Sequence, residues 1–142
     1  MPTRKSQAIW EGNLKSGKGT VKLGSGTYEG SYSFESRFEQ GKGTNPEELI
    51  AAAHAGCFSM ALAHGLEQAG YKPEQIDTTA NISIEKIGDG FSITGIELVT
   101  QAKVPDIKDK IFKEQAETAK ENCPVSKALG GTKITLQSKL VS

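Results

Sequence analysis

Two cysteines, Cys57 and Cys123, are the residues of this sequence whose type is best suited to chemistry. A thiolate attacks peroxides and disulfides, whereas a buried, protonated thiol is inert. A permanent disulfide is disfavoured in a reducing compartment, and two cysteines alone are too few ligands for a structural zinc site. The pair therefore consists either of inert core thiols or of reactive ones.

The predicted surroundings of the two cysteines differ. Cys57 lies in the middle of an apolar predicted helix, where burial raises the pKa of a thiol, so an inert core cysteine is the simpler interpretation. Its activation would need a cation from elsewhere in the fold. Cys123 precedes Pro124 at a helix break, which places it at a helix N-terminus where free N–H groups favour a thiolate. A cysteine that only caps a turn is the alternative there.

Two histidines share a helical face with Cys57, His54 three residues before it and His64 seven residues after it. A Cys–His nucleophile or a metal site could be built from them. No acidic residue lies between Leu49 and Ala63 to orient an imidazole, as metal-bound histidines usually require. We therefore expect hydrogen-bonded structural histidines and no metal.

A cation and an acid lie close together in the sequence before this helix. Glu47 and Glu48 fall in its predicted first turn, where negative charge is stabilising, and helix capping accounts for Glu48 alone. Glu47 is thus free to bind another group. Arg37 ends a predicted strand between two phenylalanines, and a short loop leads from it to Glu47. An Arg37–Glu47 ion pair within one chain is geometrically easy.

The hydrophobic pattern and the turn residues predict an α+β fold with largely antiparallel sheet, in the order β-β-β-α-β-β-α-β. The long helix has the clearest start, with Asn45 as N-cap and Pro46 at its first position, and Gly70 ends it. The predicted elements are strands 7–11, 20–23 and 28–38, helix 46–69, strands 77–87 and 91–104, helix 106–121, short helix 124–129 and strand 132–141.

The long helix carries an uncharged stretch over residues 49–63 that is apolar on all sides. At about 22 Å it is too short to cross a bilayer of roughly 30 Å. One chain with few strands can hardly cover such a helix, and its small residues permit close approach of another helix. We infer that a second copy completes the core.

Length and charge balance limit the classes of binding partner that we expect. The chain has 142 residues and a mass of 15.1 kDa, which fits a single domain spanning 1–142. Seventeen basic and seventeen acidic side chains cancel, so neither nucleic acid nor a membrane is an expected partner. The N-terminus has no apolar stretch behind its charges, which predicts no secretory signal and a cytoplasmic protein.

Specific motifs spread over nearly the whole chain resemble the OsmC/Ohr family of thiol-dependent organic hydroperoxide reductases, and more closely its OsmC branch. The most specific are the block from Asn45-Pro46-Glu47-Glu48-Leu49 to Ala55-Gly56-Cys57-Phe58 and the distant Cys123-Pro124-Val125-Ser126. The matching stretches are 8–12, 16–20, 37–39, 43–62 and 123–129.

The resemblance implies a peroxidase that reduces organic hydroperoxides with two cysteines, in an intertwined homodimer whose sheets wrap around a long central helix. By motif position, Cys57 matches the peroxidatic cysteine and Cys123 the resolving one. Arg37 matches the arginine that activates the thiolate, and Glu47 matches the acid that holds this arginine. The resemblance implies no cofactor, only an external dithiol reductant of lipoyl type.

Helix geometry adds a prediction about the dimer. Glu47 and Cys57 are ten residues apart in one predicted helix, about 15 Å along its axis, and cannot share a site within it. Antiparallel pairing with the partner's helix would bring them together, so Arg37 and Glu47 should come from one subunit and both cysteines from the other. We expect an apolar pocket for alkyl hydroperoxides, lined by Leu49, Ile50, Phe58, Met60 and Phe38.

Two other functions use the same residues. A redox sensor or regulator would oxidise the Cys57/Cys123 pair once, without turning over. A small-molecule binding protein would carry the thiols incidentally, and replacing Cys57 would leave its activity unchanged.

Overall fold

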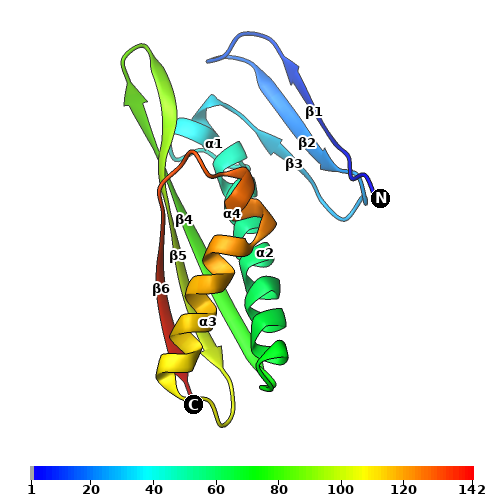
Figure 1. Ribbon diagram of the computed structural model, residues 1–142. Helices are drawn as coiled ribbons and strands as arrows, with labels where there is room; N and C mark the ends of the chain where they lie inside the picture. The colour runs from blue at the N-terminus through cyan, green and yellow to red at the C-terminus, as the bar shows by residue number, and fades with distance from the viewer. Residues whose placement is uncertain (1) are drawn as a thin grey trace. The chain divides into compact units, whose positions relative to one another are not determined.

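The computed structural model describes residues 2–142, which form two compact units, one up to Leu49 and the other from Ile50 to Ser142. In the first unit, β1 (Ser6–Glu11), β2 (Lys18–Leu23) and β3 (Glu29–Tyr32) form an antiparallel meander followed by α1 (Phe34–Phe38) (Figure 1). The meander is tightly packed at Gly19, where an added Cβ would lie 2.6 Å from the Trp10 ring.

The predicted strand 28–38 is wrong in its second half, because the chain leaves the sheet at Tyr32 and forms α1. Ser33 and Ser36 cap this helix reciprocally. The Ser36 amide donates to Ser33 Oγ at 3.1 Å and the Ser33 amide donates to Ser36 Oγ at 2.8 Å. The aromatic residues on either side indicated a strand, but this serine pair starts a helix, so Arg37 lies on a helix.

The helix α2 (Pro46–Gln68) begins and ends as predicted. Asn45 caps it through Oδ1, which accepts from the Glu48 amide at 2.7 Å, while the Glu48 carboxylate accepts from the Thr44 hydroxyl at 2.7 Å. At its other end Gly70 has φ +93°, a conformation that glycine adopts without strain, and the Tyr71 amide donates to the Leu66 carbonyl.

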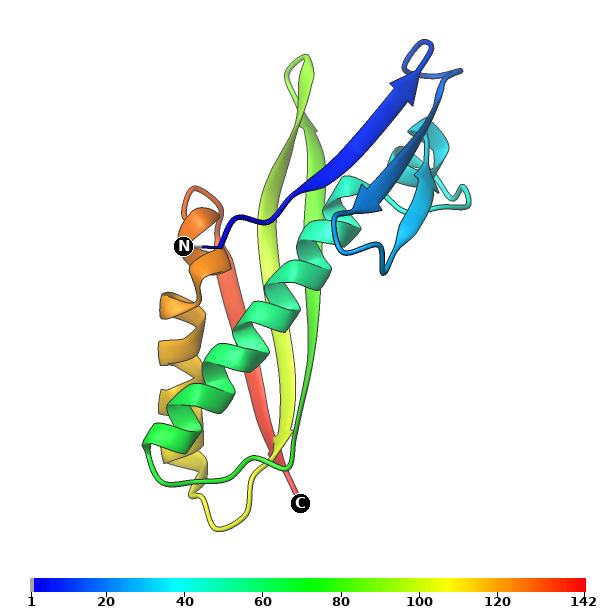
Figure 2. The ribbon, with the colours of Figure 1, turned by 90° about the vertical axis from the view of Figure 1, so that its right-hand side faces the viewer.

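In the second unit, β4 (Gln75–Ile87), β5 (Gly90–Lys103) and β6 (Ile134–Val141) form one sheet. β4 and β5 are an antiparallel hairpin and β6 pairs with β5 in parallel, which confirms a largely antiparallel α+β fold. α2 and α3 (Asp109–Asn122) pack on the same face of this sheet, and α4 (Pro124–Ala128) follows α3 after one residue (Figure 2).

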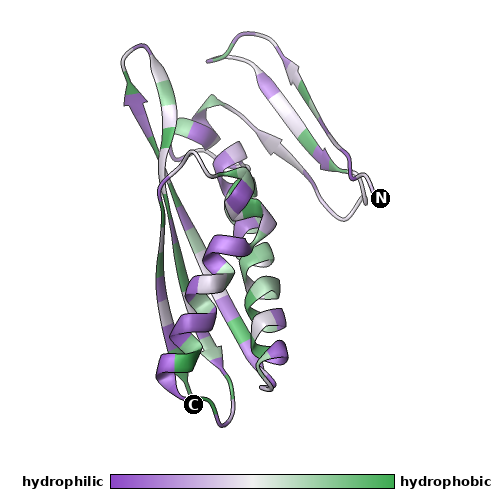
Figure 3. Cartoon of the chain, viewed as in Figure 1, coloured by the Kyte–Doolittle hydropathy of each residue, from purple (hydrophilic) through white to green (hydrophobic). Residues whose placement is uncertain are grey.

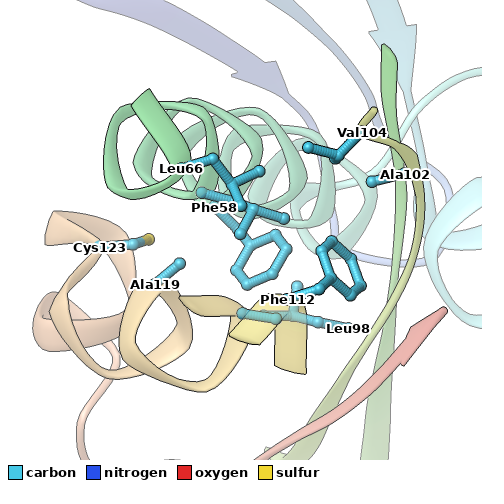
Figure 4. Packing of buried hydrophobic residues seen from close by; sticks show 10 residues of the cluster. Phe58, Leu66, Leu98, Ala102, Val104, Phe112, Ala119 and Cys123 are labelled. Carbon is cyan, nitrogen blue, oxygen red and sulfur yellow. The ribbon is translucent and has the colours of Figure 1, made fainter. Parts of the chain in front are cut away.

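The core of the second unit lies between this face of the sheet and the two helices. Phe58 from α2 and Phe112 from α3 are fully buried and meet Leu98 from β5 (Figure 4). The expectation that Phe58 lines a substrate pocket is therefore wrong, because its ring fills the core.

The opposite face of α2 has no cover within its unit. Ala52, Ala53, Gly56, Met60 and His64 are exposed along it, with Met60 76% exposed. The helix is largely hydrophobic in Figure 3, in contrast to α3. By length and mean hydropathy, 1.4, it could span a membrane, a criterion that core helices of water-soluble proteins also meet. The uncovered apolar face is what the prediction of a second copy requires.

Candidate functional site

The first part of the candidate site is an ion pair between Arg37 and Glu47, which confirms the pairing expected from sequence. Arg37 donates from Nε to Glu47 Oε1 at 3.1 Å and from Nη2 to Oε2 at 2.9 Å. This bidentate geometry fixes the plane of the guanidinium, whose carbon also lies 5.1 Å from the centre of the Phe38 ring. The Glu47 side chain is 9% exposed and that of Arg37 36%, so the cation can still reach a ligand.

A set of short hydrogen bonds holds the two elements that carry this pair. Ser36 Oγ in α1 donates to the Thr44 carbonyl at 2.7 Å, and Asn45 Nδ2 donates to the Ser36 carbonyl at 3.1 Å. The Thr44 amide donates to the Ser31 carbonyl of β3 at 2.8 Å. The start of α2 is thereby tied to α1, and Glu47 faces Arg37 as a consequence.

The second part of the candidate site consists of the two cysteines, which the fold brings together. Both are free thiols, Cys57 partly exposed in α2 and Cys123 completely buried between α3 and α4. The two side chains lie close enough that each shifts the pKa of the other. Cys123 is the N-cap of α4, with Sγ accepting from the Ser126 amide at 3.4 Å, as its position before Pro124 predicted.

The two thiols have opposite pKa shifts. Burial raises the pKa of Cys57, and a hydrogen bond from the Val125 amide does not compensate. Burial also acts to raise the pKa of Cys123, but the Ser126 hydroxyl and amide, with Cys57 and Val125, outweigh it and lower that pKa. Within the described chain Cys123 is the sulfur better stabilised as a thiolate, whereas burial raises the pKa of Cys57, as its apolar sequence surroundings predicted.

His54 is the buried, hydrogen-bonded histidine that the sequence predicted, whereas His64 is exposed. Its Nε2 lies 2.8 Å from Ser126 Oγ, and burial lowers its pKa. The residue that sequence reasoning missed is Ser126, whose hydroxyl also donates to Cys123 Sγ at 3.5 Å. Its position three residues after the N-cap Cys123 was the available signal. Among residues 2–142, no cluster of three or more metal-ligating side chains occurs.

Residues 39–139 match the family model described as OsmC-like protein, and the chain belongs to this family. It is 51% identical to peroxiredoxin OsmC of Escherichia coli (strain K12), over 98% of this chain and 97% of that protein. It is 36% identical to organic hydroperoxide resistance protein OhrB of Bacillus subtilis (strain 168), over 63% and 64% of the two chains. The crystal structure of OhrB of Bacillus subtilis matches with a TM-score of 0.73 and 25% identity, covering 96% of this chain and 98% of that one. The family and the fold inferred from the sequence motifs are thus confirmed.

Proposed function

We propose that the chain reduces organic hydroperoxides to alcohols, with Cys57 as the attacking thiol and Cys123 as the resolving thiol. The chain is a cysteine-based peroxidase, as its relatives named peroxiredoxin OsmC and organic hydroperoxide resistance protein support. The observation that carries the proposed mechanism is the contact between a partly exposed Cys57 and a buried, hydrogen-bonded Cys123.

The reaction has three steps. The Cys57 thiolate attacks the O–O bond, which breaks to release an alcohol and leaves a sulfenic acid on Cys57. Cys123 then attacks this sulfur, forming a disulfide and releasing water. An external dithiol, which we propose to be of lipoyl type, restores both thiols by exchange and becomes a disulfide itself.

Accessibility supports this division of roles. Cys123 is 0% exposed, so a bulky hydroperoxide cannot reach its sulfur, whereas Cys57 lies at the edge of the core. The apolar exposed residues beside Cys57 on α2, Gly56 and Met60, favour organic hydroperoxides over hydrogen peroxide. Equal kcat/KM for hydrogen peroxide and cumene hydroperoxide would contradict this preference.

The raised pKa of Cys57 is an argument for a shared site. The pair Arg37–Glu47 supplies an oriented cation, and ten residues of α2 separate Glu47 from Cys57, about 15 Å along the helix axis. We propose that two copies pair through the uncovered face of α2. Arg37 of one copy then stabilises the Cys57 thiolate of the other and polarises the peroxide.

A thiol count tests the proposed roles. After one equivalent of cumene hydroperoxide, the parent should lose two thiols per chain and form a disulfide. Cys123→Ser should lose one thiol and accumulate a sulfenic acid that dimedone labels, and Cys57→Ser should lose none. Oxidation of Cys57→Ser at the parental rate would overturn the assignment.

A redox sensor uses the same pair, and turnover separates the two functions. With excess dithiol, the parent should consume many equivalents of cumene hydroperoxide per chain. Consumption that stops after one equivalent would identify a sensor.

A further inference from the structure

A chain of three polar side chains leads from α2 to the buried Cys123. His54 Nε2 lies 2.8 Å from Ser126 Oγ, and Ser126 Oγ donates to Cys123 Sγ at 3.5 Å. The Ser126 amide donates to the same sulfur at 3.4 Å. All three side chains are buried, His54 and Cys123 completely and Ser126 to within 5%. Two donors on one residue thus point at a sulfur that solvent does not reach.

The number of protons available on His54 and Ser126 decides which group donates in each of these hydrogen bonds. Burial lowers the pKa of His54, which keeps its imidazole neutral with one proton to place. Ser126 has one hydroxyl proton, and when it donates to Cys123 its oxygen must accept from Nε2–H. The other ring nitrogen, Nδ1, is buried without a partner and then carries no proton. His54 therefore acts as a donor that keeps the Ser126 hydroxyl turned toward the sulfur.

We propose that His54 and Ser126 are positioning residues for the resolving step, which hold Cys123 as a thiolate ready to attack the sulfenic acid of Cys57. This inference rests on the function proposed above and assigns a role to two residues outside the Arg37–Glu47 pair. Ser126 acts on the sulfur directly, and His54 acts through Ser126.

The hydrogen bonds to Cys123 matter in the resolving step. The Cys123 thiolate attacks the Cys57 sulfur, so the S–S bond forms and the S–O bond breaks. Cys123 is oxidised, the Cys57 sulfur is reduced, and hydroxide leaves. The proton that Cys123 lost converts this hydroxide to water. Because a buried thiol resists ionisation, the two donors of Ser126 offset the cost of forming this thiolate in the core.

The groups that face Cys123 include few that titrate. α2 contributes Cys57 and, through Ser126, His54, and α4 contributes the Val125 and Ser126 donors, whereas the Ala119 carbonyl of α3 accepts from the backbone amide of Cys123. The pKa of Cys123 is lowered because hydrogen bonds with Ser126, Cys57 and Val125 outweigh burial. Removal of the Ser126 hydroxyl should therefore raise the pKa of Cys123.

A single-turnover experiment on the full chain separates the two chemical steps. One equivalent of cumene hydroperoxide is mixed with Ser126→Ala, and peroxide loss and disulfide formation are followed from about pH 6 to about pH 10. At a pH below the pKa of Cys123, each unit by which the variant raises this pKa lowers the thiolate fraction about tenfold. A thiolate of higher pKa is also more nucleophilic, so disulfide formation should slow only roughly threefold for each such unit. Above that pKa the variant should equal or exceed the parent. Peroxide loss should not change.

Matched variants show that the hydroxyl and the imidazole donor cause the effect. Ser126→Thr keeps a hydroxyl and should restore the parental pH profile. His54→Gln keeps a side-chain N–H donor and should resolve faster than His54→Leu. The control is Ser59→Ala, which removes a hydroxyl of α2 that donates to Thr78 at 2.8 Å. This variant should leave both steps unchanged.

The outcomes distinguish this inference from the proposed function. If hydroperoxide oxidises Cys57 in the parent but Ser126→Ala forms the disulfide at the parental rate at every pH, the positioning role is wrong. If Ser126→Ala slows both steps equally at every pH, its role is structural and the inference is also wrong. If the parent itself forms no Cys57–Cys123 disulfide, the proposed function fails first.

Discussion

Two sulfur atoms that contact each other carry opposite pKa shifts, and the difference lies in their hydrogen-bond donors. Cys57 receives one backbone donor that does not compensate for burial, whereas Cys123 receives a hydroxyl and backbone donors that do. Cys57 is the more exposed sulfur. In the proposed mechanism the accessible thiol is therefore the one that a cation must activate, and the inaccessible one is the one that resolves.

The orientation of Arg37 should control the first chemical step. Glu47→Gln removes the bidentate carboxylate and lets the guanidinium turn, so oxidation of Cys57 by cumene hydroperoxide should slow by roughly 10- to 100-fold. Stopped-flow peroxide loss measures this rate. The matched control is Glu48→Gln, whose carboxylate accepts from Thr44 and should matter little for the rate. Equal slowing in both variants would contradict the role of Glu47.

At the level of the elements, the loop before α2 determines where Glu47 points. Asn45 joins two elements at once, since Oδ1 caps α2 and Nδ2 donates to the Ser36 carbonyl at the end of α1. The sequence predicted this cap and the extent of α2, because a cap, a proline and a terminal glycine are local signals. It did not predict α1, because the reciprocal cap of Ser33 and Ser36 that starts this helix lies inside the segment assigned to a strand.

Loss of the Asn45 side chain should destabilise the protein measurably. Asn45→Ala removes the cap and the contact with α1, and should lower the free energy of unfolding by about 1–2 kcal/mol. Asn45→Asp keeps the capping oxygen and should lose less. Urea unfolding at fixed protein concentration gives both values, and an equal loss in the two variants would show that the cap contributes nothing.

His54 should make the contact between α2 and α4 sensitive to acid. Burial lowers its pKa below the unfolded value, so the unfolded chain binds the proton more tightly. The stabilisation of the folded state by neutral His54 is fully present above about pH 6.5, and it is lost as the pH falls through the pKa of His54 in the folded chain.

The free energy of unfolding should therefore decrease more between about pH 7.5 and about pH 5 in the parent than in His54→Gln, which cannot titrate. Urea unfolding of both proteins at the two pH values, at one protein concentration, measures the difference. Identical pH dependence would show that His54 does not titrate on unfolding.

At the level of the whole molecule, the chain is arranged as two units, with Arg37 and Glu47 in the first and both cysteines in the second. Sequence motifs were sufficient for the family, because they lie in contiguous blocks, whereas the catalytic roles of Arg37, Glu47, Cys57 and Cys123 stay predictions. Ser126 was missed as a partner of Cys123, since only the folded α4 turns its hydroxyl toward the sulfur. The single domain, the cytoplasmic location and the lipoyl-type reductant stay predictions.

The uncovered apolar face of α2 and the raised pKa of Cys57 both support the proposed pairing with a second copy of the chain. A shared site makes a prediction that no single-chain site makes. Two inactive chains, one lacking the cysteine and the other lacking the arginine, should combine into a dimer with one complete site.

The most direct measurement is therefore the turnover of an isolated heterodimer. Cys57→Ser and Arg37→Ala chains carrying different affinity tags are co-expressed, and the species bearing both tags is assayed with cumene hydroperoxide and excess dithiol. We predict about half the parental kcat per dimer, with both variant homodimers nearly inactive. Heterodimer turnover no higher than that of the variant homodimers would contradict a peroxidase site built from two copies of this chain.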